Sequence, residues 1–204
     1  EEKKAKKERK NKAKRRKTVR RIFLGLLVAV IAFFSVTTVI TVVSQNANVK
    51  KAQSFAAVEY ENQLIPEKDE NGYWTFTTDR EFKVLQLTDV HIGGGWLSAK
   101  KDGMAMNAVA AMVTAEKPDL VVLTGDNTHP NEDPEKTKKL INALMNIFES
   151  RKIPVAVTFG NHDSEGGPMT REDIMEYYKT FSCLISTDNR KNFKNCATFN
   201  VPVL

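Results

Sequence analysis

Residues 22–43 place the strongest single constraint on what this chain can fold into. They form a run of 22 residues without a charged side chain, a proline, an asparagine or a glutamine. As an α-helix rising ~1.5 Å per residue, the run would measure ~33 Å, enough to cross a hydrocarbon core of ~30 Å. The core helix of a soluble protein is rarely apolar on every side over this length. We therefore predict that Ile22–Val43 is a transmembrane helix in contact with a lipid bilayer.

A cleaved signal peptide is the alternative interpretation of this run. Signal peptides have an apolar core of roughly 7–15 residues, with a cleavage site of small residues close behind. Here the core is longer, and the best site, Ser54-Phe55-Ala56, lies well beyond it. Val42-Val43-Ser44 is a weaker candidate site. We favour an uncleaved signal-anchor.

The segment before the span determines the predicted orientation. Residues 1–21 carry 13 Lys and Arg against three Glu, a net charge of +10, whereas the whole chain carries +6. The remainder is therefore mildly acidic at −4, which argues against a nucleic-acid-binding domain. The tail has no apolar period, and we expect it to be solvated and disordered. The positive-inside rule places it in the cytoplasm and the later residues outside, as in a single-pass protein of the cell membrane.

The chain after the span divides into a polar stretch and a domain. Residues 44–72 are predicted to be a stalk or linker, with a short helix near residues 52–60, and residues 73–204 to form the domain. At its start, Tyr73–Thr77 and Glu81–Thr88 are β-like runs separated by a short polar turn. This pattern predicts a β-hairpin.

Strand-like and helix-like segments alternate from residue 82 onward. Helix starts are indicated by Asp133-Pro134 and by the sequence Thr170–Asp173, which resembles a capping box. Buried strands are predicted at residues 82–88, 120–124 and 153–159, and helices at about 101–116, 133–150 and 170–181. The alternation predicts parallel βαβ units, and so an α/β fold whose sheet is covered by helices.

Polar residues follow each predicted strand directly. The carboxyl ends of parallel strands lie side by side in α/β sheets, and ligands bind there. Core packing offers no reason for three polar clusters at three equivalent strand ends. The residues expected to converge are Asp89, His91, Asp126, Asn161 and His162.

In this order, the clusters resemble the first three signatures of the calcineurin-like metallophosphoesterases. They are Asp89-x-His91, Gly125-Asp126 and Gly160-Asn161-His162-Asp163. The stretches DLVVLTGDN and VTFGNHDSEGG are similar to membrane-associated and purple-acid-phosphatase-like members. The resemblance covers about residues 82–181. It implies a metal-dependent phosphoric ester hydrolase, and the first βαβαβ part of a β-sandwich flanked by helices.

The resemblance also implies a role for each matching residue. Asp89 and His91 would bind a first metal ion, Asp126 would bridge two ions, and Asn161 would bind the second. His162 would face the phosphoryl group, with Asp163 orienting its ring. Carboxylate, imidazole and amide ligands suit Mn, Fe or Zn. Two such divalent ions would activate a hydroxide for in-line attack on phosphorus.

One position departs from the purple acid phosphatases. These enzymes place a metal-binding tyrosine three residues after the Gly-Asp aspartate, where this chain has His129. Double-strand-break repair nucleases of the same superfamily have a histidine at that spacing, where it supports phosphate chemistry. A surface histidine in a loop is an equally open interpretation. Asn127 and His129 are thus candidate phosphate contacts.

The end of the chain lacks part of what the resemblance implies. The family uses further metal-binding histidines after this point, but none of the three His in this chain lies beyond His162. We expect the chain to be an incomplete part of the domain that binds fewer than two ions tightly. The only cysteines, Cys183 and Cys196, are too few for a cysteine-ligated metal module. Whether they pair stays open.

These observations predict a membrane-anchored, two-metal phosphoesterase. Its partners would be a phosphorylated small-molecule or ester substrate and the bilayer, with no nucleic acid. Phosphate monoesters are the substrate class that we predict first, and phosphodiesters or nucleotide pyrophosphates are the second. A non-catalytic surface metal-binding or structural module is the alternative from another class. A cytoplasmic nuclease, suggested by His129 and the basic tail, is opposed by the apolar span and the acidic body.

Overall fold

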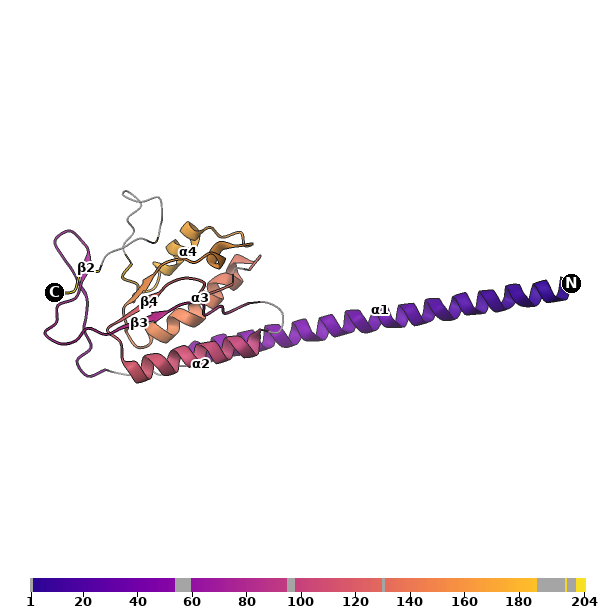
Figure 1. Cartoon of the computed structure of the whole chain (residues 1–204), viewed down its shortest axis with the longest axis horizontal. Coiled ribbons are helices and arrows are strands. Elements are labelled where there is room, and N and C mark those ends of the chain that lie inside the picture. Colours follow the sequence, from indigo (N-terminus) through magenta and orange to yellow (C-terminus); the bar gives the residue numbers. More distant parts are fainter. Residues whose placement is uncertain (1, 54–59, 95–97, 130, 187–196, 198–200) are drawn as a thin grey trace.

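A long N-terminal helix leads into an α/β domain in the computed structural model, which describes residues 2–53, 60–94, 98–129, 131–186, 197 and 201–204 (Figure 1). Helix α1, Glu2–Gln53, runs without a break through the predicted tail, the apolar span and the start of the predicted linker. The prediction of a disordered tail is therefore wrong. Residues 2–21 contain neither glycine nor proline, and their lysine, arginine, alanine and glutamate residues favour a helix.

The last turns of α1 pack against the domain. α1 contacts helix α2, Ala99–Glu116, and helix α3, Pro134–Glu149. Asn48 Nδ2 donates to the carbonyl of Ala99 at 2.6 Å. The covered side chains recur every three or four residues, as one helix face requires: Thr41, Ser44, Gln45, Asn48, Val49 and Ala52. We call these six residues the docked stripe. The predicted linker thus begins as a docked helix.

The central sheet has three parallel strands in the order β3-β4-β5. They are β3, Val84–Leu87, β4, Leu120–Leu123, and β5, Val155–Val157. Because crossovers are right-handed and the strands follow in sequence, α2 and α3 lie on one face of the sheet. Helix α4, Arg171–Tyr178, follows β5. The predicted α/β architecture with a parallel sheet is confirmed.

Alternate strand residues build two cores. On the helix face, Val121, Leu123 and Val155 belong to a cluster that includes Leu144 and Phe148. On the opposite face, Leu120 and Ala156 pack with Phe76 and Ile185. β3 was predicted to be buried, but Val84 is 50% exposed. The reason is that β3 is an edge strand of the described sheet, so it has a neighbour on one side only.

The predicted hairpin at the start of the domain is wrong. β2, Trp74–Thr75, pairs antiparallel with β1, Glu67–Lys68, and not with β3. The turn that joins β1 to β2 contains Asp69, whose side chain accepts hydrogen bonds from the backbone N–H groups of Asn71 and Tyr73. Such a turn, helped by Gly72 at φ 81°, needs no tertiary partner. The helix predicted near residues 52–60 falls largely on 54–59, which lie outside the described residues.

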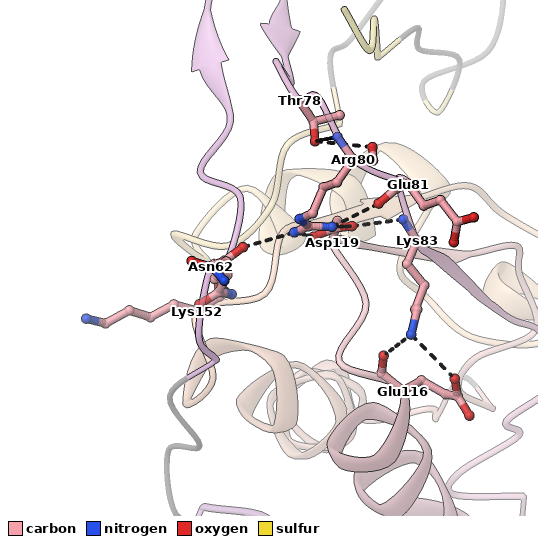
Figure 2. A network of polar contacts seen from close by, with 9 residues as sticks. Asn62, Thr78, Arg80, Glu81, Lys83, Glu116, Asp119 and Lys152 are labelled. Carbon is pink, nitrogen blue, oxygen red and sulfur yellow. Dashed lines mark hydrogen bonds and ion pairs between the residues drawn. The ribbon is translucent and has the colours of Figure 1, made fainter.

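The segment proposed as a turn, Thr78–Arg80, instead ties the domain together (Figure 2). The Arg80 guanidinium donates to both oxygens of Asp119, at 2.6 and 2.9 Å, and to the carbonyl of Asn62. Asp119 also accepts the Lys83 N–H at 2.8 Å. Since Lys83 and Asp119 immediately precede β3 and β4, this network closes the amino ends of the strands.

We expect this network to make stability depend on pH. Asp119 is 3% exposed, and burial alone would raise its pKa. The Arg80 and Lys83 donors outweigh burial and hold the pKa of Asp119 below its usual range. A depressed folded-state pKa adds stability above the unfolded pKa of ~3.9, and this stability is lost as pH falls through the folded value. Asp119→Asn should therefore lower the free energy of unfolding by about 1–3 kcal/mol at pH 7, and by less at acidic pH. The loss is limited because Arg80 is itself partly exposed.

Urea unfolding in detergent at pH 3 to 7 measures this difference. The exposed neighbour Asp79 offers the matched control Asp79→Asn. Equal unfolding free energies for the two variants at pH 7 would contradict the assignment.

Candidate metal centre

The polar residues that follow the three strands meet at the carboxyl edge of the sheet. Backbone pairing continues past the strands, with Asp89 N–H donating to Gly125 O at 3.1 Å and His91 N–H to Asp126 O at 3.0 Å. An isolated bridge then joins Ile92 to Thr128. The loops after β3 and β4 therefore run side by side, which brings Asp89 and His91 next to Asp126.

The candidate ligands occupy unusual backbone conformations. Asp89, His91 and Asp126 have φ values of 55°, 49° and 52°. This left-handed region costs a residue other than glycine roughly 1–2 kcal/mol. Such strain persists only where surrounding contacts impose it, and it concentrates at functional sites.

Two glycines let the turns after β4 and β5 touch. A Cβ on Gly125, whose φ is 106°, would lie 2.1 Å from the amide nitrogen of Gly160. A Cβ on Gly160 would lie 2.3 Å from Asp126 Oδ1. Any other residue at either position would force the backbones apart. The glycines that precede the second and third polar clusters are thus required by close packing.

Three side chains form a compact ligand set. The ligand atoms of Asp89, His91 and Asp126 all lie within 4.8 Å of one another, and His91 Nε2 lies 3.4 Å from Asp89 Oδ1. Thr88 Oγ1 donates to Asp89 Oδ2 at 2.6 Å, and this bond, above all, holds the pKa of Asp89 below its usual value. Two carboxylates and an imidazole at this spacing fit a divalent transition metal.

All three histidines of the chain gather at this site. The ring centroid of His91 lies 4.6 Å from that of His129 and 5.5 Å from that of His162. His91 Nδ1 lies 3.0 Å from His129 Nε2. Burial, followed by the charges of His91 and His162, lowers the pKa of His129, so its neutral ring can accept a hydrogen bond from His91 Nδ1–H. His129 is therefore placed in the site and contacts a candidate ligand.

Asp163 does not orient the His162 ring as predicted. It is 2% exposed, and its carboxylate accepts the backbone N–H groups of Asp126 at 2.8 Å, Asn127 at 3.2 Å and Gly160 at 2.7 Å. Asp163 thereby joins the loop after β4 to the loop after β5.

The partner of the His162 ring is Glu165. The 3₁₀-helix His162–Ser164 turns Asp163 inward, and the carboxylate of Glu165 lies 2.5 Å from His162 Nδ1. Glu165 is not among the site residues predicted from the sequence. The i,i+3 spacing of a histidine and a glutamate was the available signal.

Two further predicted site residues differ in exposure. Asn127 is fully buried, and its amide has no hydrogen-bond partner among the residues that the structure describes. Its predicted contact with phosphate stays a prediction, and leaving the buried amide unpaired costs about 1–3 kcal/mol. Asn161 is exposed and does not cap the 3₁₀-helix that follows it, so its amide is available. Cys183 is a buried free thiol, and Cys196 lies outside the described residues.

Comparisons with known proteins identify the family of this chain. Residues 82–202 match the family described as "Calcineurin-like phosphoesterase". In Arabidopsis thaliana, "Probable inactive purple acid phosphatase 29" is 31% identical over 124 residues, which cover 55% of this chain and 31% of the relative. "Probable inactive purple acid phosphatase 14" is 35% identical over 114 residues, covering 50% and 28%.

A yeast relative carries a different description. "Phosphatase DCR2" of Saccharomyces cerevisiae is 32% identical over 110 residues, covering 49% of this chain and 19% of the relative. The chain thus spans a third or less of the length of these relatives. No solved structure matches the chain significantly.

Proposed function

Because the chain belongs to the calcineurin-like phosphoesterase family, we propose that it is a membrane-anchored hydrolase that uses two divalent metal ions. Phosphate monoesters are the first substrate class, and phosphodiesters the second. The observation that carries this proposal is the cluster of Asp89, His91 and Asp126 at the carboxyl edge of the sheet.

Each residue has a distinct task in this proposal. Asp89 and His91 would hold one ion, Asp126 would contact both, and Asn161 would hold the second. The ions would supply Lewis acidity and positive charge beside the phosphate group. The His162 ring donates from Nδ1 to Glu165, which leaves Nε2 to give a proton to the departing alkoxide.

Metal titration tests these tasks. Asp126→Asn should lose more bound Mn²⁺ than Asn161→Ala, because Asp126 serves both ions. His129→Phe should weaken metal affinity about 10- to 100-fold, because it removes the acceptor that orients His91. Isothermal calorimetry measures each affinity, and the exposed Glu172 supplies the control Glu172→Gln. If Asn161→Ala removed as much metal as Asp126→Asn, the assignment of a bridging role to Asp126 would be excluded.

Turnover of model esters separates catalysis from mere metal binding. We expect hydrolysis of p-nitrophenyl phosphate, and slower hydrolysis of its bis ester, in the presence of Mn²⁺ by a longer protein that also carries the further metal-binding histidines implied by the resemblance. Two relatives have the word "inactive" in their names, which favours the alternative of a non-catalytic metal-binding module. Tight metal binding without turnover of either ester would support that alternative and exclude the hydrolase.

The anchor is supported by the uncovered apolar part of α1. Phe23 and Leu26 are 69% and 61% exposed, and α1 is long and apolar enough to cross a membrane. We expect the protein to stay in the membrane fraction after carbonate washing, as a spanning helix should. Release into the wash would exclude the anchor. A soluble variant that begins at Gln45 should be released and serves as the control.

A further inference from the structure

The docking of α1 determines which end of the domain faces the membrane. Asn48 contacts the first residue of α2, and α1 residues 42–49 line small cavities with Lys136 and Leu140 in the first half of α3. Figure 1 shows α1 leaving the domain on the side where α2 begins. Because strands in βαβ units run against their helices, their carboxyl ends also point to that side. The edge that carries the candidate site therefore faces the apolar span.

The site lies close to the membrane along the axis of α1. Ile92, next to His91, lines a cavity with Gln45 and Val49, and Gly93 lines one with Val42. Val49 is six residues past Val43, or ~9 Å along the helix. The headgroup layer extends roughly 5–7 Å beyond the hydrocarbon core. The loop that carries His91 is thus level with the lipid headgroups or just outside them.

Two lysines lie at the same level. Lys136 and Lys139 line a cavity of about 130 Å³ together with Val42 and Gln45. Both are exposed, and neither forms an ion pair with another described residue. Lysines in this position attract anionic phosphate groups of lipids. At the opposite edge of the domain, the Lys152 side chain extends away from the Arg80–Asp119 network (Figure 2).

We propose that the substrate is a phosphate monoester carried by a membrane lipid and reached at headgroup level. This proposal rests on the anchored hydrolase proposed above. Water forms a new bond to phosphorus and releases one proton to the solvent, the bond from phosphorus to the lipid oxygen breaks, and that oxygen takes a proton from His162, which regains one from the solvent. The products are a lipid alcohol and inorganic phosphate. Because the site edge faces the bilayer, lipid-bound esters are concentrated there, whereas soluble esters are not.

Fluorescence quenching tests the placement without using activity. A bimane label is attached at Lys136→Cys or at Asp79→Cys, in a protein that carries Cys183→Ala and Cys196→Ala. Each protein is reconstituted into vesicles containing lipids spin-labelled at the headgroup. We expect strong quenching at position 136 and little at position 79, which lies beside Arg80 at the opposite edge. Equal quenching at the two positions would overturn the placement.

A helical spacer tests the substrate class. Seven helix-forming residues that end in Thr-Val-Val, inserted after Val43, restore the side chains of Thr41 and Val42 at the same distance before Ser44; they move the domain ~10.5 Å outward and rotate it by only ~20°. The same insertion after Gln53, where the docked stripe has ended, leaves the distance unchanged and is the matched control. The substrates are phosphatidic acid in vesicles and soluble glycerol 3-phosphate.

We expect the parent protein to prefer phosphatidic acid by roughly tenfold or more, through the higher effective concentration at the surface. Insertion after Val43 should abolish this preference and keep the soluble rate, while the control insertion keeps both rates. An equal ratio of the two rates in all three proteins would overturn the lipid proposal. Absence of turnover with both esters would instead overturn the hydrolase on which it rests, and the quenching result would still decide the placement.

Discussion

His162→Ala is expected to keep bound metal while lowering kcat by about two to four powers of ten, the range for loss of a general acid or an oxyanion donor. The variant retains metal because only the backbone of His162 serves the ligand set. Its N–H donates to Asp126 Oδ1 at 2.7 Å, and alanine preserves that bond. Turnover of p-nitrophenyl phosphate and metal content are measured on the same sample.

Glu165→Gln is the graded comparison for this prediction. It keeps the His162 ring but replaces the charged acceptor at Nδ1 with a neutral one. We expect a loss of about tenfold, smaller than that of His162→Ala, because the ring is less firmly oriented. The exposed Lys152→Ala should leave kcat unchanged. If His162→Ala removed metal as completely as Asp126→Asn, His162 would be a ligand and its proposed role would be wrong.

Asp163→Asn should unfold or severely loosen the domain. The buried carboxylate accepts three backbone N–H groups from two loops, and charge-assisted bonds of this kind contribute roughly 1.5–3 kcal/mol each. An asparagine can offer only one acceptor oxygen, so its NH₂ group would face a backbone donor. Since the contributions of the three hydrogen bonds are not additive, we expect the free energy of unfolding to fall by about 3–5 kcal/mol. This is a large part of the ~5–15 kcal/mol that stabilises a typical domain.

Asp173→Asn is the matched control. Asp173 accepts from Thr170 in the capping box of α4, and its replacement should destabilise the protein far less than replacement of the buried Asp163. Urea unfolding compares the two variants, and metal titration shows whether the loops separate in Asp163→Asn. A variant with normal stability and a reduced kcat would instead restore the predicted role of Asp163 in orienting His162.

The sequence alone determined the alternation of strands and helices and the edge at which polar residues gather. Helix starts such as Asp133-Pro134 and Thr170–Asp173 depend on residues adjacent in the chain, and both caps form. Convergence of Asp89, His91 and Asp126 follows from two general rules. Parallel strands must end at one edge, and right-handed crossovers keep neighbouring βαβ units in register.

Only the tertiary structure decided what each polar side chain contacts. His91 and His129 are 38 residues apart, and Asp163 reaches amides 36 and 37 residues away. Such contacts depend on left-handed turns that set the direction of each side chain, and on the close approach of Gly125 to Gly160. No local propensity encodes these directions.

The position of the site relative to the membrane also comes from tertiary packing. The apolar run by itself predicts a span, but it leaves the orientation of the domain free. A stripe of mostly polar residues on the last turns of α1 removes that freedom, because it packs beside the first turns of α2 and α3. Its members, such as Asn48, bury their polar groups only where a partner such as the Ala99 carbonyl is available. That complementarity exists only once the sheet and its helices have formed.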